Sequence, residues 1–167
     1  DTPNPLNVYG HTKLLGEKII EYMCDKYYII RTSGLYGKHP CRGKGKNFVD
    51  LMLHLAKTNK EIKVVDNEEL CPTNTYLLSK QVFQMMHSNI PYGLYHAVSN
   101  GSCTWYKFAK EIFKIKDIAV NVIKAGPNDF PQKTPRPSFT ALKNYNLDKI
   151  NYNFMPTWKE GLKGYLN

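Results

Sequence analysis

The sequence contains no apolar run long enough to form a membrane-spanning helix. Such a helix needs about 20 consecutive apolar residues, and no stretch of the 167 residues approaches that length. No signal peptide is visible either. Hydrophobic content of 42% and charged content of 22% are ordinary for a soluble globular protein. We therefore expect no membrane partner and a chain long enough for one domain with a real core.

Cysteine is scarce, and the four cysteines are widely scattered. They are Cys24, Cys41, Cys71 and Cys103. None forms a C-x-x-C pair, and the histidines show no zinc-like spacing beside them. The pattern argues against a disulfide framework and predicts no metal site within this chain. Unpaired cysteines suit a reducing compartment, so we expect a cytoplasmic protein.

Acidic residues are in the minority, which leaves a net charge of +9. A basic balance can mark a nucleic-acid-binding module. However, the one dense cluster of cations lies in a single Gly-rich loop, residues 38–46, and no recognition helix, zinc finger or aromatic RNA-binding motif accompanies it. The loop suits a ligand that carries a diphosphate, or it is simply solvated. We expect no nucleic-acid partner.

Helical and strand patterns alternate along the chain, which is typical of an α/β fold. Helices are predicted over residues 6–25, 48–57, 76–87, 105–113, 145–149 and 158–166, and strands over 27–33, 61–65, 94–98 and 121–123. Asn47 suits the N-cap of the second helix. The apolar stripe of that helix is expected in the core; it consists of Phe48, Leu51, Met52 and Leu55.

Tyr9 and Lys13 are four residues apart on the first predicted helix, so their side chains share one face. A free phenol has a pKa near ~10 and exchanges its proton poorly at neutral pH. A neighbouring ammonium favours the phenolate, so such a pair can serve as a general acid or base at a carbonyl oxygen. The alternative is a first-turn aromatic residue beside a solvated lysine, and the spacing alone favours that alternative.

Two further segments are candidates for ligand contacts. Ligands of α/β sheets bind beyond the carboxyl ends of the strands, which places Arg31, Thr32, Ser33 and Gly34 next to the Tyr/Lys pair. Arg136 lies between two prolines in the irregular segment 126–138, and a guanidinium on a stiffened backbone suits phosphate or carboxylate recognition. A surface arginine in a loop is the other interpretation.

Several blocks together resemble the dTDP-4-dehydrorhamnose reductase family of extended short-chain dehydrogenases/reductases. The blocks are Pro5-Leu6-Asn7-Val8-Tyr9-Gly10 with Thr12-Lys13 and Gly16-Glu17, Arg31-Thr32-Ser33 with Tyr36-Gly37, Asn47-Phe48-Val49, Pro72-Thr73, Gly93-Leu94-Tyr95-His96 and Arg136-Pro137. They occur in the order and spacing of that family and cover nearly the whole chain. The resemblance implies reduction of the 4-keto group of dTDP-4-dehydrorhamnose with NADPH or NADH.

The resemblance also implies a role for each matching residue. Tyr9 would deliver a proton to the C4 oxygen, with Lys13 assisting it and binding the cofactor ribose. The nicotinamide end of the cofactor would contact Arg31, Thr32 and Ser33. The nucleotide-sugar would face Gly34, Asn47, Phe48 and Arg136, although Gly34 stands where many family members have tryptophan. Some relatives form a dimer bridged by a metal, so Mg²⁺ at a dimer interface is a further implication.

The Gly-rich turn that opens such enzymes is missing, because no G-x-x-G-x-x-G follows a strand. We therefore expect the C-terminal portion of a Rossmann-like NAD(P)-binding fold plus the smaller α/β substrate-binding lobe. Residues 1–167 would form a single incomplete domain, with 1–36 at the end of the Rossmann sheet and 37–167 mainly in the substrate lobe. Such a chain should be inactive alone. Its exposed strand edge should favour a homo-oligomer or association with the missing N-terminal half.

Two other functions share this fold. One is a non-catalytic regulatory or binding subunit, against which the presence of both Tyr9 and Lys13 argues. The other is a nucleotide-sugar epimerase or dehydratase, which has the same Tyr/Lys pair. The Arg-Thr-Ser run at 31–33 favours the reductase, since those enzymes tend to carry asparagine near that point.

Overall fold

The computed structural model describes residues 2–39, 45–126, 129–131 and 134–167. The helices are α1 (Val8–Met23), α2 (Phe48–Leu55), α3 (Thr75–Met86), α4 (Trp105–Ile115), α5 (Tyr145–Lys149) and α6 (Trp158–Leu166). The strands are β1 (Tyr28–Arg31), β2 (Leu35–Tyr36), β3 (Glu61–Val64), β4 (Glu69–Leu70), β5 (Thr73–Asn74), β6 (Gly93–His96), β7 (Cys103–Thr104) and β8 (Asn121–Lys124). The four longer strands and all six helices fall where the sequence predicts them, with ends that differ by a few residues.

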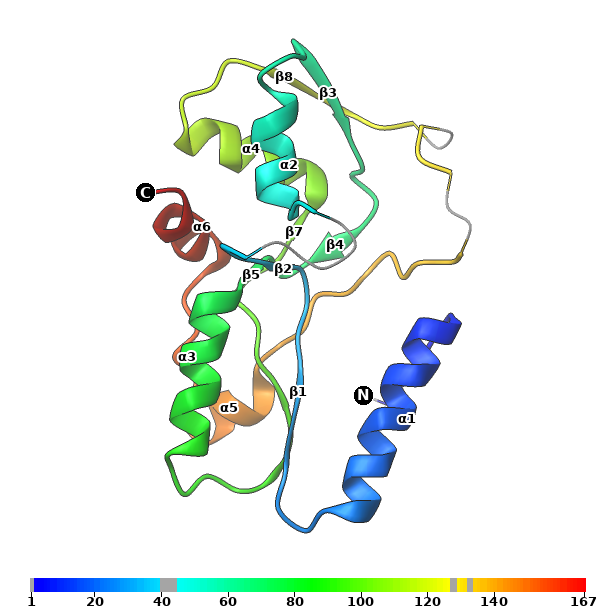
Figure 1. Cartoon of the computed structure of the whole chain (residues 1–167), viewed down its shortest axis with the longest axis vertical. Helices are drawn as coiled ribbons and strands as arrows, with labels where there is room; N and C mark the ends of the chain where they lie inside the picture. The colour runs from blue at the N-terminus through cyan, green and yellow to red at the C-terminus, as the bar shows by residue number, and fades with distance from the viewer. Residues whose placement is uncertain (1, 40–44, 127–128, 132–133) are drawn as a thin grey trace.

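The strands form pairs between segments that are far apart in the chain (Figure 1). Three pairs are parallel: β1 with β6, β2 with β5, and β3 with β8. The pair β4–β7 is antiparallel. Parallel partners require long crossovers, and each of these crossovers contains at least one helix. The predicted α/β class is confirmed. The two-residue strands β2, β4, β5 and β7 were not predicted, because two residues show no periodicity.

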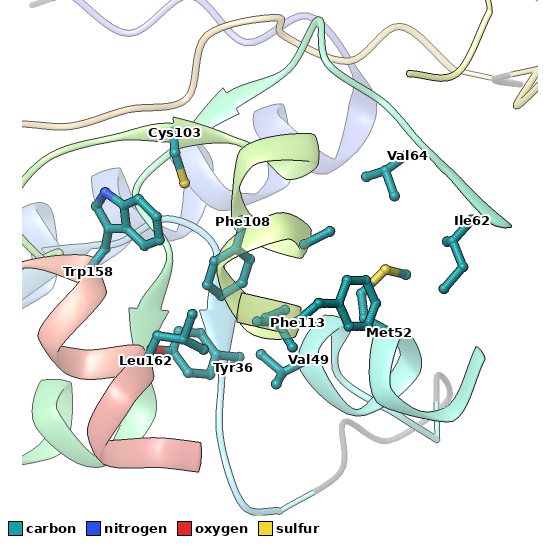
Figure 2. Packing of buried hydrophobic residues seen from close by; sticks show 12 residues of the cluster. Tyr36, Val49, Met52, Ile62, Val64, Cys103, Phe108, Phe113, Trp158 and Leu162 are labelled. Atoms are coloured by element: carbon teal, nitrogen blue, oxygen red, sulfur yellow. The ribbon is translucent and has the colours of Figure 1, made fainter. Parts of the chain in front are cut away.

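The larger hydrophobic core surrounds α4 (Figure 2). Phe108 and Ile112 of this helix are fully buried. The Phe108 ring lies 5.5 Å from that of Tyr36 and 5.7 Å from that of Phe48, so β2 and α2 pack on the same helix. The prediction for Leu51 was wrong: its side chain is 40% exposed. The start of α2 instead turns Val49 inward, and that residue is completely buried.

A second, smaller core lies on one face of the β1–β6 pair. It contains Met85 of α3, Tyr95 of β6 and Leu147 of α5, with Tyr28 and Ile30 of β1 packed against them. The helices α3 and α5, which are distant in sequence, thus cover one face of these two strands. The second core therefore joins the start of the chain to its middle and end.

Helix α1 contrasts with both cores, because none of its residues is buried. Its large apolar side chains remain open, among them Leu15 at 60% and Ile19 at 48% exposure. Figure 1 shows α1 standing beside the rest of the molecule at one edge. In the part of the chain that the structure describes, no helix is long and apolar enough to cross a membrane.

Candidate functional site

Tyr9 and Lys13 share one face of α1, as the helical spacing predicts. The Lys13 ammonium nitrogen lies 5.6 Å from the centre of the Tyr9 ring. The Tyr9 side chain is 71% exposed and lies in the first turn of the helix. The phenol is therefore open to a ligand that approaches the start of α1.

The same Tyr/Lys geometry recurs elsewhere, a point that the sequence analysis overlooked. On α3, the Lys80 ammonium lies 4.5 Å above the Tyr76 ring, and on α4 the Lys110 ammonium lies 5.6 Å from the Tyr106 ring. Helical spacing produces this contact wherever tyrosine precedes lysine by four residues. The pair alone therefore does not identify an active site. The residues that surround the pair must provide that evidence.

A bidentate ion pair ties α1 to the carboxyl end of β1. The Glu17 carboxylate accepts from Arg31 Nε at 2.8 Å and from Arg31 Nη2 at 2.6 Å. Hydrogen bonding to Arg31 lowers the pKa of Glu17, and hydrogen bonding to Glu17 raises the pKa of Arg31. Arg31 was expected to line the nicotinamide end of the cofactor. In the structure its guanidinium binds Glu17.

The residues that follow β1 face the interior. The Thr32 hydroxyl is buried and has no hydrogen-bond partner among the described residues. Ser33 is 8% exposed, and its hydroxyl lies 3.4 Å from the backbone nitrogen of Cys71, which donates to it. Gly34 has a φ of +57°, and a Cβ there would come within 2.6 Å of Leu70 Cδ1. The same Cβ would lie 2.9 Å from the backbone oxygen of Cys71, so both the conformation and the space at this position favour glycine.

Asn47 and Phe48 begin α2 and are engaged in packing. The Asn47 amide caps the helix through Asp50 N–H at 3.0 Å, as predicted, and also donates to the carbonyl of Gly37 at 2.8 Å. The Phe48 ring packs against Trp105 with centroids 4.5 Å apart. Both residues lie on the side of the larger core. Most of the basic loop before them, residues 40–44, lies outside the described residues.

Arg136 lines a hollow of about 590 Å³ between the β3–β4 turn and the segment after β8. The lining residues are Val65, Asp66, Asn67, Glu68, Lys124, Ala125, Gly126, Phe130, Arg136 and Ser138. The Lys124 ammonium lies 2.7 Å from the Asp66 carboxylate, which lowers the pKa of Asp66 and raises that of Lys124. The hollow combines two cations with two carboxylates, Asp66 and Glu68, and an exposed Phe130 ring. Because Lys124 is paired with Asp66, Arg136 is the cation better placed to meet an anionic ligand with a flat ring.

A second hollow of about 520 Å³ lies at the carboxyl ends of β1 and β6. Arg31, His96 and Lys143 contribute to its lining. Burial lowers the pKa of His96, whose Nδ1 is 3.1 Å from the Lys143 carbonyl. In the sequence, His96 stands out only as the last residue of the block Gly93-Leu94-Tyr95-His96. Its position opposite Arg31 in the strand register is the reason that it lies here.

No three metal-binding side chains gather at one place within the described ranges. The Mg²⁺ that the resemblance allows at a dimer interface stays a prediction. Of the cysteines, Cys71 and Cys103 are buried, and Cys24 is exposed. Burial raises the pKa of the Cys103 thiol to about 12, so this thiol is inert at neutral pH.

Comparison with known proteins gives the same answer from sequence and from structure. The model of the RmlD substrate binding domain matches residues 1–167. The dTDP-4-dehydrorhamnose reductase of Escherichia coli (strain K12) is 37% identical over 180 residues, which cover 100% of this chain and 58% of that protein. The crystal structure of a dTDP-4-dehydrorhamnose reductase from Clostridium acetobutylicum ATCC 824 has a TM-score of 0.90 and 39% identity, over 99% of this chain and 57% of that one.

A second crystal structure carries a cofactor. The dTDP-4-dehydrorhamnose reductase from Bacillus anthracis str. Ames, in complex with NADP, has a TM-score of 0.87 and 36% identity over 99% of this chain and 56% of that one. The chain thus spans a little over half the length of the relatives that it matches. The predicted fold, the C-terminal part of such a protein, is confirmed.

Proposed function

The chain belongs to the RmlD substrate-binding-domain family, and on this premise we propose that it is the catalytic-helix and substrate-binding part of an NAD(P)H-dependent dTDP-4-dehydrorhamnose reductase. The observation that carries the proposal is the family match over residues 1–167, within which Tyr9 and Lys13 share an open face of α1. Relatives at 36–39% identity bear the reductase name. The substrate would be the 4-keto sugar of dTDP-4-dehydrorhamnose.

The chemistry at the sugar needs one hydride and one proton. A bound nicotinamide cofactor would supply the hydride to C4. Tyr9 would donate the phenolic proton to the C4 oxygen as charge develops there, and the Lys13 ammonium would stabilise the phenolate that remains. The exposure of Tyr9 supports this role, because the hydroxyl can reach a ligand without any rearrangement of α1.

The chain's own residues fit one end of the cofactor. Tyr9 and Lys13 present open polar groups suited to the ribose, and the buried Thr32 hydroxyl lacks a partner among the described residues. Arg31 and Ser33, in contrast, are engaged with Glu17 and with Cys71. We therefore retain Tyr9, Lys13 and Thr32 as cofactor contacts and assign Arg31 to holding α1. NADPH and NADH both remain candidates.

The hollow beside Arg136 is our proposed site for the nucleotide part of the substrate. The Arg136 guanidinium would pair with the diphosphate, and the exposed Phe130 ring would offer a face to the thymine. Asn47 and Phe48 would support the wall of the substrate lobe from α2. Gly34 would contribute backbone only, since no side chain fits there.

We further propose that residues 1–36 end the cofactor sheet and that 37–167 form mainly the substrate lobe. The structure adds that β6, α3 and α5 pack with β1 in the smaller core, so later segments return to the cofactor side. The second edge of β1 and the open face of α1 would meet the N-terminal half of the complete enzyme, or a second copy of the chain.

Isothermal titration of this chain with dTDP-L-rhamnose tests the proposal directly. We expect binding without any cofactor, because the hollow at Arg136 is built entirely by this chain. The variant R136A should bind about 10- to 150-fold more weakly, since a hydrogen bond to a charged group contributes about 1.5–3 kcal/mol. R136K should restore part of the affinity, because lysine keeps the charge and loses the bidentate geometry.

The matched control is K114A, which removes an exposed cation from α4, outside the lining of the hollow. It should bind like the wild type. Failure of the folded wild-type chain to bind the nucleotide-sugar, with folding verified by circular dichroism, would contradict the proposed function. If R136A and K114A lost equal affinity, the effect of Arg136 would be explained by the net charge of the chain and not by a contact in the hollow.

A further inference from the structure

The side chain of Asn7 joins the first helix to the segment that carries Arg136. Its Oδ1 accepts a hydrogen bond from the backbone N–H of Gly10 at 2.9 Å and thereby caps α1. Its Nδ2 donates to the backbone carbonyl of Pro135, also at 2.9 Å. A single amide group therefore serves two segments that are 128 residues apart in the sequence.

Arg136 follows Pro135 directly and lies between two fixed points. The rings of Pro135 and Pro137 restrict the backbone on both sides of it. Beyond Pro137, the carbonyl of Ser138 accepts a hydrogen bond from the backbone N–H of Glu69 at 2.8 Å. One anchor of Arg136 thus comes from α1, and the other comes from β4.

The start of α1 is itself tightly built around Tyr9. A Cβ at Gly10 would come within 2.8 Å of Pro5 Cβ, so the chain that leads into the helix packs directly on the glycine. Tyr9 thus belongs to a helical turn that Asn7 caps and whose Gly10 packs against Pro5. Figure 1 shows the start of α1 next to the segment that follows the yellow-to-orange change of colour, which contains Pro135.

We propose that Asn7 is a positioning residue, which holds Arg136 in register with Tyr9 so that one nucleotide-sugar reaches both. The inference rests on the proposed function. Asparagine suits the role because its amide accepts at Oδ1 and donates at Nδ2. Serine and aspartate are equally good helix caps, but neither has the amide donor, so the cap and the link can be separated by mutation.

The experiment is a double-mutant cycle of N7S and R136A, read by titration with dTDP-L-rhamnose. N7S keeps a cap and loses the donor to Pro135, and we expect about three- to tenfold weaker binding, the range of one neutral hydrogen bond. N7D, which keeps the cap and places a carboxylate against the Pro135 carbonyl, should lose at least as much. In the R136A background, N7S should cause no further loss, because its effect passes through Arg136.

Two results would overturn the inference: wild-type affinity in N7S, or losses from N7S and R136A that simply add. Protection of the Gly10 amide from hydrogen exchange verifies that N7S retains its cap. If the wild-type chain does not bind the nucleotide-sugar, the proposed function fails. The link from Asn7 to Arg136 can then be tested in the protein without any ligand. ¹⁵N relaxation should then show a more mobile Arg136 amide in N7S than in the wild type, and an unchanged amide would refute the link.

Discussion

At the scale of single residues, the Tyr9–Lys13 pair is defined by its location. Tyr76–Lys80 and Tyr106–Lys110 have similar ring-to-ammonium distances on other helices. Those tyrosines also lie in the first turn of a capped helix. Tyr9 differs in that the ion pair of Glu17 with Arg31 fastens its helix to β1. The role of a proton donor depends on where the phenol is held relative to the substrate.

Replacement of Tyr9 by phenylalanine should abolish proton delivery in a complete reductase that contains this chain. We expect kcat to fall by about 10²- to 10⁴-fold, the usual contribution of general acid catalysis. Y76F is a matched control, because it removes a similarly exposed phenol with the same lysine spacing, and it should keep full activity. An active Y9F enzyme would contradict the role of Tyr9 as proton donor. The isolated chain should show no turnover, and measurable turnover would contradict its expected dependence on the N-terminal half.

Residue roles were predictable from sequence where they depend on neighbours along the chain. The capping of α2 by Asn47 is local and was predicted correctly. Another of its hydrogen bonds, to the Tyr165 hydroxyl at 3.1 Å, joins residues 118 positions apart and leaves no local signal. Arg31 illustrates the same limit: the sequence places it at a strand end, but its commitment to Glu17 follows from how α1 folds back on β1.

At the scale of elements, α1 is held mainly by polar contacts. No residue of the helix is buried, whereas α4 buries Phe108, Ala109, Ile112 and Phe113. The long-range hydrogen bonds of α1 and its N-cap include the Glu17–Arg31 pair and the Asn7–Pro135 bond. The sequence predicted α1 from its apolar periodicity, which in this chain marks a face that the described residues leave open.

The attachment of α1 should depend on pH through Glu17. Because Arg31 lowers the pKa of Glu17 in the folded state, the pair stabilises α1 fully above the unfolded pKa of about 4.3. That contribution is lost as the pH falls through the lowered pKa of the folded protein. Hydrogen exchange of α1 amides should therefore accelerate below about pH 4 in the wild type.

E17Q should show the faster exchange already at neutral pH, by an amount that corresponds to about 1 kcal/mol for loss of a charge-assisted bond, and little further change in acid. E21Q is the control, since Glu21 is hydrogen-bonded to Lys18 on the same helix and acts on Arg31 through its charge, without a hydrogen bond to it among the described residues. Identical exchange profiles for E17Q and the wild type would show that the ion pair does not hold the helix.

At the scale of the whole molecule, the chain combines two hydrophobic cores with an exposed apolar edge formed by α1 and β1, and this edge favours association. The larger core is complete around α4, and the smaller core covers one face of β1–β6. The exposed apolar side chains of α1, such as Leu15 and Ile19, lie beside a strand with one unpaired edge. Exposed apolar surface of this kind promotes association.

We expect the isolated chain to self-associate through α1. The double variant L15K/I19K should shift the sedimentation velocity profile toward monomer, because two lysines repel across such a contact. L51K is the control, since Leu51 is a comparably exposed residue on α2, and it should leave the profile unchanged. A wild-type chain that sediments as a single monomeric species would rule out this contact.

The pairing of strands also determines the order in which this protein can assemble. Register partners Tyr28 and Gly93 are separated by 65 positions, and Glu61 and Asn121 by 60. A growing polypeptide therefore completes β1 long before its partner exists, and the smaller core also waits for α5. Such high contact order gives refolding on the millisecond-to-second scale, so during synthesis Tyr9 and β1 emerge well before the segments that pair with β1 and cover it.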